Sequence, residues 1–185
     1  RSHKRKELHM TIFIVVGMPA AGKNLARTYA ERNGIPYFAS GDIVRNTVKT
    51  RGLDPDAQNM ASVSTELRGK DGLGVTRHVL AAALQSGREI VFMEGMRSWP
   101  EIELIRRETV CVVIAFLAPR ALRLQRIIYR GRSDDSPEAF EERDMREIKY
   151  GAAIPIALAD EYILNTSTME EALGKIGHIE QGYKK

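Results

Sequence analysis

The sequence predicts an α/β protein built on a doubly wound, five-stranded parallel sheet. Short apolar runs alternate with longer amphipathic ones, and the apolar runs are continuous rather than alternating with polar residues. Continuous apolar runs separated by helices are typical of parallel strands that are covered on both faces. A third observation agrees with this class: a glycine-rich turn, G-x-x-x-x-G-K, directly follows the first apolar run.

The expected strands, in chain order, are 11–16, 35–39, 89–94, 109–117 and 160–165. Helical patterns are expected at 23–33, 41–51, 55–68, 74–86, 99–107, 119–130, 137–149 and 168–180. Two segments are longer than a plain crossover between parallel strands requires. We interpret the helical stretch at about 41–86 and the charged stretch at about 128–148 as insertions that cover a site. Both belong to one expected domain, 10–183.

The composition is that of an ordinary globular protein, with 43% hydrophobic and 28% charged residues in a chain of 185. No apolar run approaches the roughly 20 residues that a membrane span requires. The first nine residues contribute +3 of the formal net charge of +4, so the remainder is close to neutral. We expect 1–9 to be an expression-derived or disordered arm, which makes nucleic acid an unlikely partner.

The single cysteine, Cys111, lies inside an apolar run. One thiol forms neither an intramolecular disulfide nor a zinc site, so a buried structural thiol is the expected role. A chain with one cysteine and no intramolecular disulfide favours a reducing compartment, so the expected location is the cytoplasm.

The glycine-rich turn at 17–24 has the context of a phosphate-binding loop, because a strand pattern precedes it and a helical pattern follows it. Glycines allow the backbone to point several N–H groups at one anion, and Lys23 adds a full charge for the β- and γ-phosphates. The residues expected to hold the nucleotide are Gly17, Pro19, Ala20, Ala21, Gly22, Lys23 and Asn24.

Asn24 departs from the usual loop, where Ser or Thr gives Mg²⁺ a hydroxyl ligand. An amide oxygen can also face a hard cation, or Mg²⁺ can be held mostly by water and phosphate oxygens. Asn24 therefore weakens a prediction of catalysis more than a prediction of nucleotide binding. Glu94 ends the third expected strand at the edge of the sheet where ligands bind, and a carboxylate at the end of an apolar strand is costly unless it serves a ligand.

Four further segments carry a resemblance: Y-F-A-S-G-D-I-V-R-N-T-V (37–48), V-F-M-E-G-M-R-S (91–98), R-L-Q-R-I-I-Y-R-G-R-S-D-D (123–135) and A-D-E-Y-I-L-N-T-S-T-M-E-E-A-L (159–173). In this order, and across about 10–180, they resemble nucleoside-monophosphate kinases such as adenylate kinase, and the last segment also resembles dephospho-CoA kinase. The chain is similar as well to a group of archaeal adenylate-kinase-related proteins of unsettled function, in which G-R-S-D-D and E-E-R-D recur. The resemblance implies that Glu94 contacts Mg²⁺ through water.

The resemblance implies an acceptor site formed by Arg45 and Arg97, with Arg68 as either a pocket residue or a surface arginine. Arg45 follows Asp42 by one helical turn, so both can face the same ligand. Asp42 itself is either the N-cap of its helix or a carboxylate near the acceptor, where it could take a proton from a hydroxyl.

A run of arginines follows the fourth expected strand: Arg123, Arg126, Arg130 and Arg132. Such a run is usually a solvated face paired with acids, but the resemblance favours a closing lid that neutralises the transferring phosphoryl group. Arg130 and Arg132 are the preferred catalytic pair, and Arg143 and Arg146 are weaker candidates. At the last strand, Asn165 and Ser167 either contact an adenine edge or cap the final helix.

The leading hypothesis is thus a phosphotransferase that uses ATP and Mg²⁺, with Lys23, Asp42, Arg97, Arg130 and Arg132 as its catalytic residues. The acceptor is a nucleotide, or alternatively a hydroxyl compound such as dephospho-CoA. A hypothesis from another class is an adenine-nucleotide sensor without turnover, which the unusual Asn24 supports.

Overall fold

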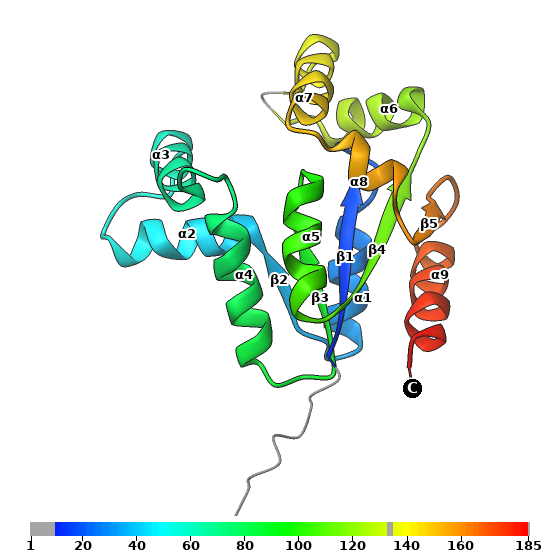
Figure 1. The fold of residues 1–185 in the computed structure, drawn as a ribbon. Coiled ribbons are helices and arrows are strands. Elements are labelled where there is room, and N and C mark those ends of the chain that lie inside the picture. The colour runs from blue at the N-terminus through cyan, green and yellow to red at the C-terminus, as the bar shows by residue number, and fades with distance from the viewer. Residues whose placement is uncertain (1–9, 133–134, 185) are drawn as a thin grey trace, which may run out of the picture.

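The computed structural model describes residues 10–132 and 135–184 of the chain. It confirms a five-stranded, all-parallel sheet with helices on both faces and the strand order β2-β3-β1-β4-β5 (Figure 1). The predicted arm at 1–9 lies outside the described residues, as do residues 133 and 134 of the predicted lid.

Each predicted strand is present, with small differences in its bounds. β2 is shorter than predicted because it begins after Pro36, which has no N–H for the sheet ladder. The strands are β1 (Thr11–Gly17), β2 (Tyr37–Ala39), β3 (Ile90–Glu94), β4 (Val110–Leu117) and β5 (Glu161–Leu164).

The eight predicted helices are also present, and the described residues contain one more, α8. α8 has five residues and includes a proline, so it is too short to show a helical period in the sequence. The helices are α1 (Asn24–Arg32), α2 (Ser40–Thr50), α3 (Ala57–Arg68), α4 (Gly74–Gln85), α5 (Trp99–Glu108), α6 (Arg120–Arg130), α7 (Pro137–Lys149), α8 (Ala153–Ala157) and α9 (Met169–Gly182).

Two apolar layers sandwich the sheet, because successive side chains of a strand point to opposite faces. In β1, Ile12 and Ile14 pack in the layer that contains α4 and α5, whereas Phe13 and Val15 pack in the layer that contains α1 and α9. α2 and α3 extend from the first layer to one side, and α6 and α7 lie beyond the carboxyl ends of the strands (Figure 1).

β1 lies between β3 and β4, so the chain changes direction across the sheet at this strand. Ligands of open α/β sheets bind at such a point, outside the carboxyl ends of the strands. The segment that follows each strand therefore meets the others at one edge, and this edge contains most of the predicted site residues.

Cys111 is partly buried in β4, and burial raises the pKa of its thiol to about 11. It is protonated at neutral pH, which agrees with a structural role. In the part of the chain that the structure describes, every helix is too short or too polar to cross a bilayer.

Candidate active site

The phosphate loop, residues 17–24, joins β1 to α1 and includes backbone angles that side chains with a Cβ atom rarely adopt. Gly22 has a φ of +106°, and a Cβ atom at this position would lie 2.0 Å from Nδ2 of Asn165. Ala20 has a φ of 61° and is the one non-glycine residue with positive φ among the residues described. Such backbone strain persists only where the surrounding contacts impose it, and it is concentrated at functional sites.

The loop presents N–H groups that have no partner in its own backbone. The amides of Ala20, Gly22, Lys23 and Asn24 donate to no backbone carbonyl of the described residues. The Nζ atom of Lys23 donates to the carbonyl oxygen of Gly17 at 2.8 Å, inside the curve of the loop. Converging N–H groups, a helix N-terminus and an ammonium group together form an anion site.

Side chains from distant parts of the chain hold the loop in this shape. Arg123 donates to the carbonyl oxygen of Pro19 at 3.0 Å and makes a bidentate ion pair with Asp144, with both distances 2.7 Å. Arg126 donates to the carbonyl oxygens of Ala20 and Asn165. These two arginines belong to the predicted lid run, but in the structure they brace the loop.

Asn165 completes this bracing, since its side-chain amide donates to the carbonyl oxygen of Ala21 at 3.0 Å. It is buried under the loop, whereas the sequence alone left its role open between an adenine contact and a helix cap. Ser167 hydrogen-bonds to Glu171 and thereby lowers the pKa of that carboxyl group. Thr168, not Ser167, is the N-cap of α9.

A cavity of about 300 Å³ opens beside the loop at the carboxyl ends of β1 and β3. Lys23, Glu94 and Arg97 line it, as the sequence predicts for a reaction centre, and Glu147 of α7 lines it as well. Burial lowers the pKa of Lys23, although the nearby carboxylates of Glu94 and Glu147 act in the opposite direction. Two cationic side chains, Lys23 and Arg97, and two carboxylates therefore line one cavity.

Glu94 is fixed by a neighbour that the sequence did not indicate. The hydroxyl of Tyr37 donates to Oε2 of Glu94 at 2.6 Å. Burial, together with the charge of Glu94, raises the pKa of Tyr37 far above its usual range. The guanidinium of Arg27 lies 4.5 Å from the centre of the Tyr37 ring. One oxygen of Glu94 is thus held, and the carboxylate is aimed from the end of β3.

Asp42 is not the N-cap of α2, because the helix begins two residues earlier, at Ser40, with Ala39 at the N-cap position. Its carboxylate instead accepts from Arg27 at 2.9 Å and from Arg45 at 3.1 Å. The structure therefore brings together Asp42 and Arg45, as predicted, and adds Arg27 to them.

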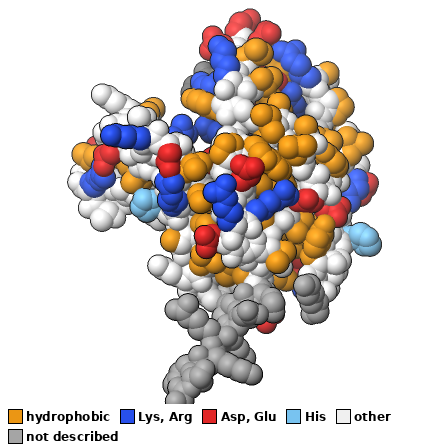
Figure 2. Space-filling model, in the orientation of Figure 1, with side chains coloured by type: hydrophobic (Ala, Val, Ile, Leu, Met, Phe, Trp, Pro, Cys, Tyr) orange, Lys and Arg blue, Asp and Glu red, His pale blue; other side chains and the backbone are white. Residues whose placement is uncertain are grey.

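Arg68 and Arg97 both contact the ring of Tyr150, the residue that follows α7. Their guanidinium carbons lie 5.8 Å and 5.4 Å from the centre of the Tyr150 ring. Figure 2 shows Lys and Arg side chains along the hollow between the α2–α3 part of the molecule and the α6–α7 part. Arg97 lines the cavity beside Lys23, and Arg68 contacts the same Tyr150 ring as Arg97.

Arg130 ends α6 and Arg132 follows it, and both contact the carboxylate of Asp135. Asp135 accepts from the side chains of Arg130 and Arg143 and from the backbone N–H of Arg132. These contacts hold the pKa of the Asp135 carboxyl well below its usual range. In this conformation the arginines do not line the cavity beside Lys23.

The residues described contain no group of three or more His, Cys, Asp or Glu side chains that could hold a metal ion. Asn24 is exposed at the first turn of α1, and Glu94 lines the cavity. Together they could supply at most two protein ligands. A cation here would need phosphate oxygens and water for the rest of its shell.

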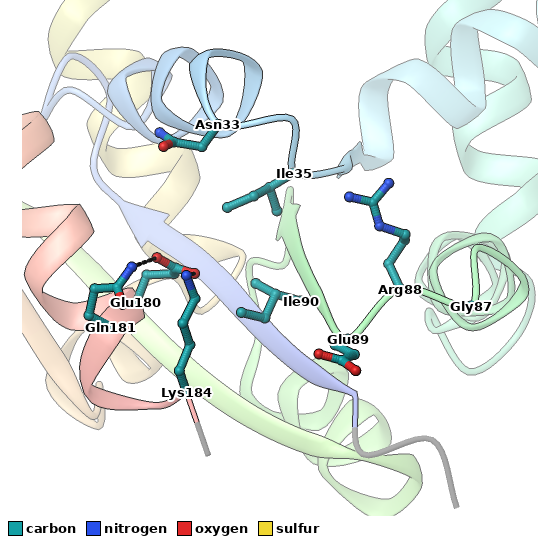
Figure 3. A pocket seen from close by; sticks show the side chains of 9 residues that line it. All are labelled: Asn33, Ile35, Gly87, Arg88, Glu89, Ile90, Glu180, Gln181 and Lys184. Carbon is teal, nitrogen blue, oxygen red and sulfur yellow. Dashed lines mark hydrogen bonds and ion pairs between the residues drawn. The ribbon is translucent and has the colours of Figure 1, made fainter. Parts of the chain in front are cut away.

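A larger pocket, about 400 Å³, lies at the opposite edge of the sheet, by the amino end of β3 (Figure 3). Three of its four charged side chains are already engaged: Glu180 pairs with Lys184, and Arg88 donates to the carbonyl oxygen of Gly34. It is remote from the phosphate loop, so we do not assign it to the candidate site.

Sequence reasoning missed four residues of the site: Arg27, Tyr37, Glu147 and Tyr150. Each acts through a partner from another element, and no local motif marks such partners. The one available signal was weak: Glu147 follows Asp144 by three residues on a predicted helix, which places both on the same face.

The sheet order and the loop geometry define a P-loop domain of the kinase-like class. A family model described as AAA domain (AAA_17) matches residues 16–141. A UPF0200 protein of Methanosarcina mazei is 38% identical to this chain over 166 residues, which cover 87% of this chain and 89% of the relative. The chain belongs to the UPF0200 family, and the resemblance to P-loop kinase-like proteins is confirmed.

Solved structures agree on the fold. TT1252 from Thermus thermophilus has a TM-score of 0.68 at 15% identity, with 96% of this chain and 100% of that chain covered. Shikimate kinase from Bacteroides thetaiotaomicron has a TM-score of 0.62 at 15% identity, with 93% and 98% covered. At these identities the likeness establishes the architecture alone.

Proposed function

We propose that the protein is an ATP-dependent phosphotransferase that moves the γ-phosphoryl group to a small acceptor with a phosphate of its own, such as a nucleoside monophosphate. One observation carries this proposal. Lys23 of the phosphate loop and Arg97 beyond β3 line the same cavity, so a donor phosphate and an acceptor phosphate would meet there. The chain's membership in a P-loop kinase-like family supports the same class of reaction.

On the donor side, the free N–H groups of the loop would bind the β- and γ-phosphates of ATP, and Lys23 would bridge them. Asn24 could contact Mg²⁺ directly and Glu94 could do so through water, because both offer oxygens at this edge. When bound, Mg²⁺ would neutralise part of the charge on the transferring group. The braces on the loop keep its N–H groups aimed before ATP arrives.

On the acceptor side, Arg97 would bind the acceptor phosphate, and Arg45 and Arg68 would supply further positive charge. An oxygen of that phosphate would attack the γ-phosphorus while the bond from γ-phosphorus to the β–γ bridging oxygen breaks, which releases ADP. The attacking oxygen is already anionic, so positioning and charge neutralisation suffice. Arg130 and Arg132 would add positive charge if the α6–α7 region closed over the cavity.

The contacts of Asp42 favour a phosphate acceptor over a hydroxyl acceptor. Both of its oxygens accept from arginines, Arg27 and Arg45. Asp42 therefore suits the positioning of Arg45 better than the deprotonation of a hydroxyl.

A nucleotide sensor without turnover is the second candidate, and Asn24 is the observation that favours it, since the usual hydroxyl ligand of Mg²⁺ is absent. The near-neutral charge outside residues 1–9 argues against nucleic acid as the ligand. The single cysteine, which forms no intramolecular disulfide, supports a reducing compartment such as the cytoplasm.

A transfer assay with γ-labelled ATP and Mg²⁺ tests the proposal. The acceptors would be AMP, CMP, UMP and GMP, with dephospho-CoA and shikimate as hydroxyl compounds. Lys23→Ala serves as the blank, and Lys175→Ala, which removes an exposed lysine of α9, is the matched control. We expect label on one nucleoside monophosphate, lost in Lys23→Ala and retained in Lys175→Ala.

Label on no acceptor, together with Lys23-dependent ATP binding in calorimetry, would replace the kinase by the sensor. ATP binding that is unchanged in Lys23→Ala would reject both. Asn24→Ser and Asn24→Thr test the loop residue directly, and each is expected to raise Mg²⁺-dependent turnover. Lower turnover in both would mean that Asn24 serves the reaction itself.

A further inference from the structure

One face of helix α7 reaches both halves of the candidate site. Asp144 holds Arg123, and Arg123 in turn holds the carbonyl oxygen of Pro19 in the phosphate loop. Glu147, three residues further along the same face, pairs with Arg97, with 3.3 Å between Oε2 and Nε. The helix that braces the donor loop therefore also places a carboxylate on the acceptor-side arginine.

Glu147 occupies a place suited to an incoming anion. Its side chain is 18% exposed and lines the cavity together with Lys23, Glu94 and Arg97. A guanidinium binds carboxylates and phosphates through the same donors. Glu147 thus makes at Arg97 the kind of contact that the phosphate of an acceptor would make.

The backbone around Glu147 shows that this contact belongs to the fold. The N–H of Ala152 donates to the carbonyl oxygen of Glu147 at 3.1 Å, which closes the end of α7. Gly151 has a φ of +96°, and a Cβ there would lie 3.5 Å from the carbonyl oxygen of Arg97. The segment after α7 is therefore packed against the Arg97 backbone.

A second ion pair on the same helix provides a contrast. Glu141 lies 3.7 Å from Arg120, and the two side chains are 69% and 58% exposed. This pair lines no part of the cavity beside Lys23. Position, rather than the mere presence of an acid on α7, distinguishes Glu147.

We infer that Glu147 is an internal competitor for the anionic group of the acceptor at Arg97. It holds Arg97 until a phosphate dianion displaces it; a singly charged carboxylate gains no more at Arg97 than Glu147 already provides. Glu147 is therefore a specificity-determining residue that favours phosphomonoester acceptors. The inference rests on the proposed function in so far as Arg97 serves the acceptor.

Titration with inorganic phosphate, followed by calorimetry on the full chain with ADP present, tests this inference. Glu147→Gln removes the charge at nearly constant size, and we expect it to tighten phosphate binding about fivefold. Glu147→Asp shortens the side chain and is expected to tighten binding in the same direction. Glu141→Gln makes the same change of net charge on the same helix and is expected to leave phosphate affinity unchanged.

The variant Arg97→Ala decides where the effect arises. Arg97→Ala should weaken phosphate binding, and adding Glu147→Gln to it should restore nothing, because the competition requires Arg97. Unchanged or weaker phosphate binding in Glu147→Gln would overturn the inference. ADP binding is measured separately in the unsubstituted chain and in Lys23→Ala. This comparison tests the proposed nucleotide site independently, so failure of the inference and failure of the proposed function are distinguishable.

Discussion

The phosphate loop and the acceptor side of the cavity are held by different kinds of contact. The loop rests on Arg123, Asp144 and Asn165, each 6% exposed. The acceptor side rests on half-exposed pairs, such as Arg45 with Asp42, whose side chains are 49% and 42% exposed. The donor half of the site is therefore rigid before any ligand binds, and the acceptor half consists of contacts that a ligand can exchange.

The energies of the two kinds of contact differ accordingly. Removing one partner of a buried ion pair leaves a charge without compensation and costs about 3–5 kcal/mol. Exposed pairs contribute about 0.2–1 kcal/mol and are weakened further by salt. A site built this way retains its phosphate loop while the acceptor arginines change partners.

The largest effect should come from the brace beneath the loop. Arg123→Ala removes both short contacts of the buried Asp144 carboxylate and leaves it only the more distant Arg120, 4.0 Å away, so we expect the free energy of unfolding to fall by about 3 kcal/mol. Urea denaturation measures this, with Arg45→Ala as the comparison, expected to cost about 1 kcal/mol or less. Equal losses in the two variants would remove the distinction between the two halves.

Gly22→Ala tests the shape of the loop itself. The new Cβ would lie 2.0 Å from Nδ2 of Asn165 at a φ of +106°, so the loop must distort. Backbone strain of this kind costs about 1–3 kcal/mol, and nucleotide affinity should fall more than about tenfold. Gly41→Ala is the matched control, because a Cβ there meets no atom within 4 Å. Calorimetry with ATP should show full affinity for the control alone.

The pKa of Lys23 offers a prediction of intermediate size. Burial holds the pKa of Lys23 in the folded chain below its value of 10.5 in the unfolded chain. At a pH between these two pKa values, Lys23 is protonated in the unfolded chain and largely deprotonated in the folded chain. The free energy of unfolding therefore rises with pH in this range. Bound phosphate would raise the pKa again, so nucleotide binding at a pH between the lowered value and 10.5 should take up a fraction of a proton.

Calorimetry in two buffers of different ionisation enthalpy measures this uptake. Lys23→Arg keeps the charge at every pH in the range, so its proton uptake should vanish while some affinity remains. The same uptake in Lys23→Arg as in the natural sequence would assign the proton to another group.

The smallest effect on stability is expected on the acceptor side. Asp42→Asn removes the charge that holds Arg27 and Arg45, and it should change the free energy of unfolding by about 1 kcal/mol or less. Acceptor binding, measured as KM in the transfer assay, should change more than stability does, because Arg45 loses its fixed position. A large loss of stability with an unchanged KM would make Asp42 a structural residue.

The sequence was sufficient for the sheet and for the loop because their signals are local. The apolar runs and the G-x-x-x-x-G-K turn each lie within a few residues, and the structure has them at nearly the predicted bounds. The start of α2 was missed because Asp42 resembles an N-cap, while the chain already becomes helical at Ser40. Short-range patterns commonly misplace helix ends by one or two residues.

The partners in the site could not be predicted because they join distant elements. The roles of Arg123 and Arg126 depend on loop carbonyls more than 100 positions away. In the sequence they resemble any other arginines of a charged helix. The contact of Tyr37 with Glu94 likewise requires β2 and β3 to pair in register, which neither strand shows alone.

The contact between Asn165 and Ala21 has a consequence for the synthesis of the chain. The two residues are 144 positions apart, so β5 must be synthesised, long after the loop, before this brace can form. A fragment that ends before β5 would contain the whole glycine-rich turn without its finished shape. Contacts of such long separation form late in folding. Competence to bind a nucleotide would therefore arise only after β5 has been made.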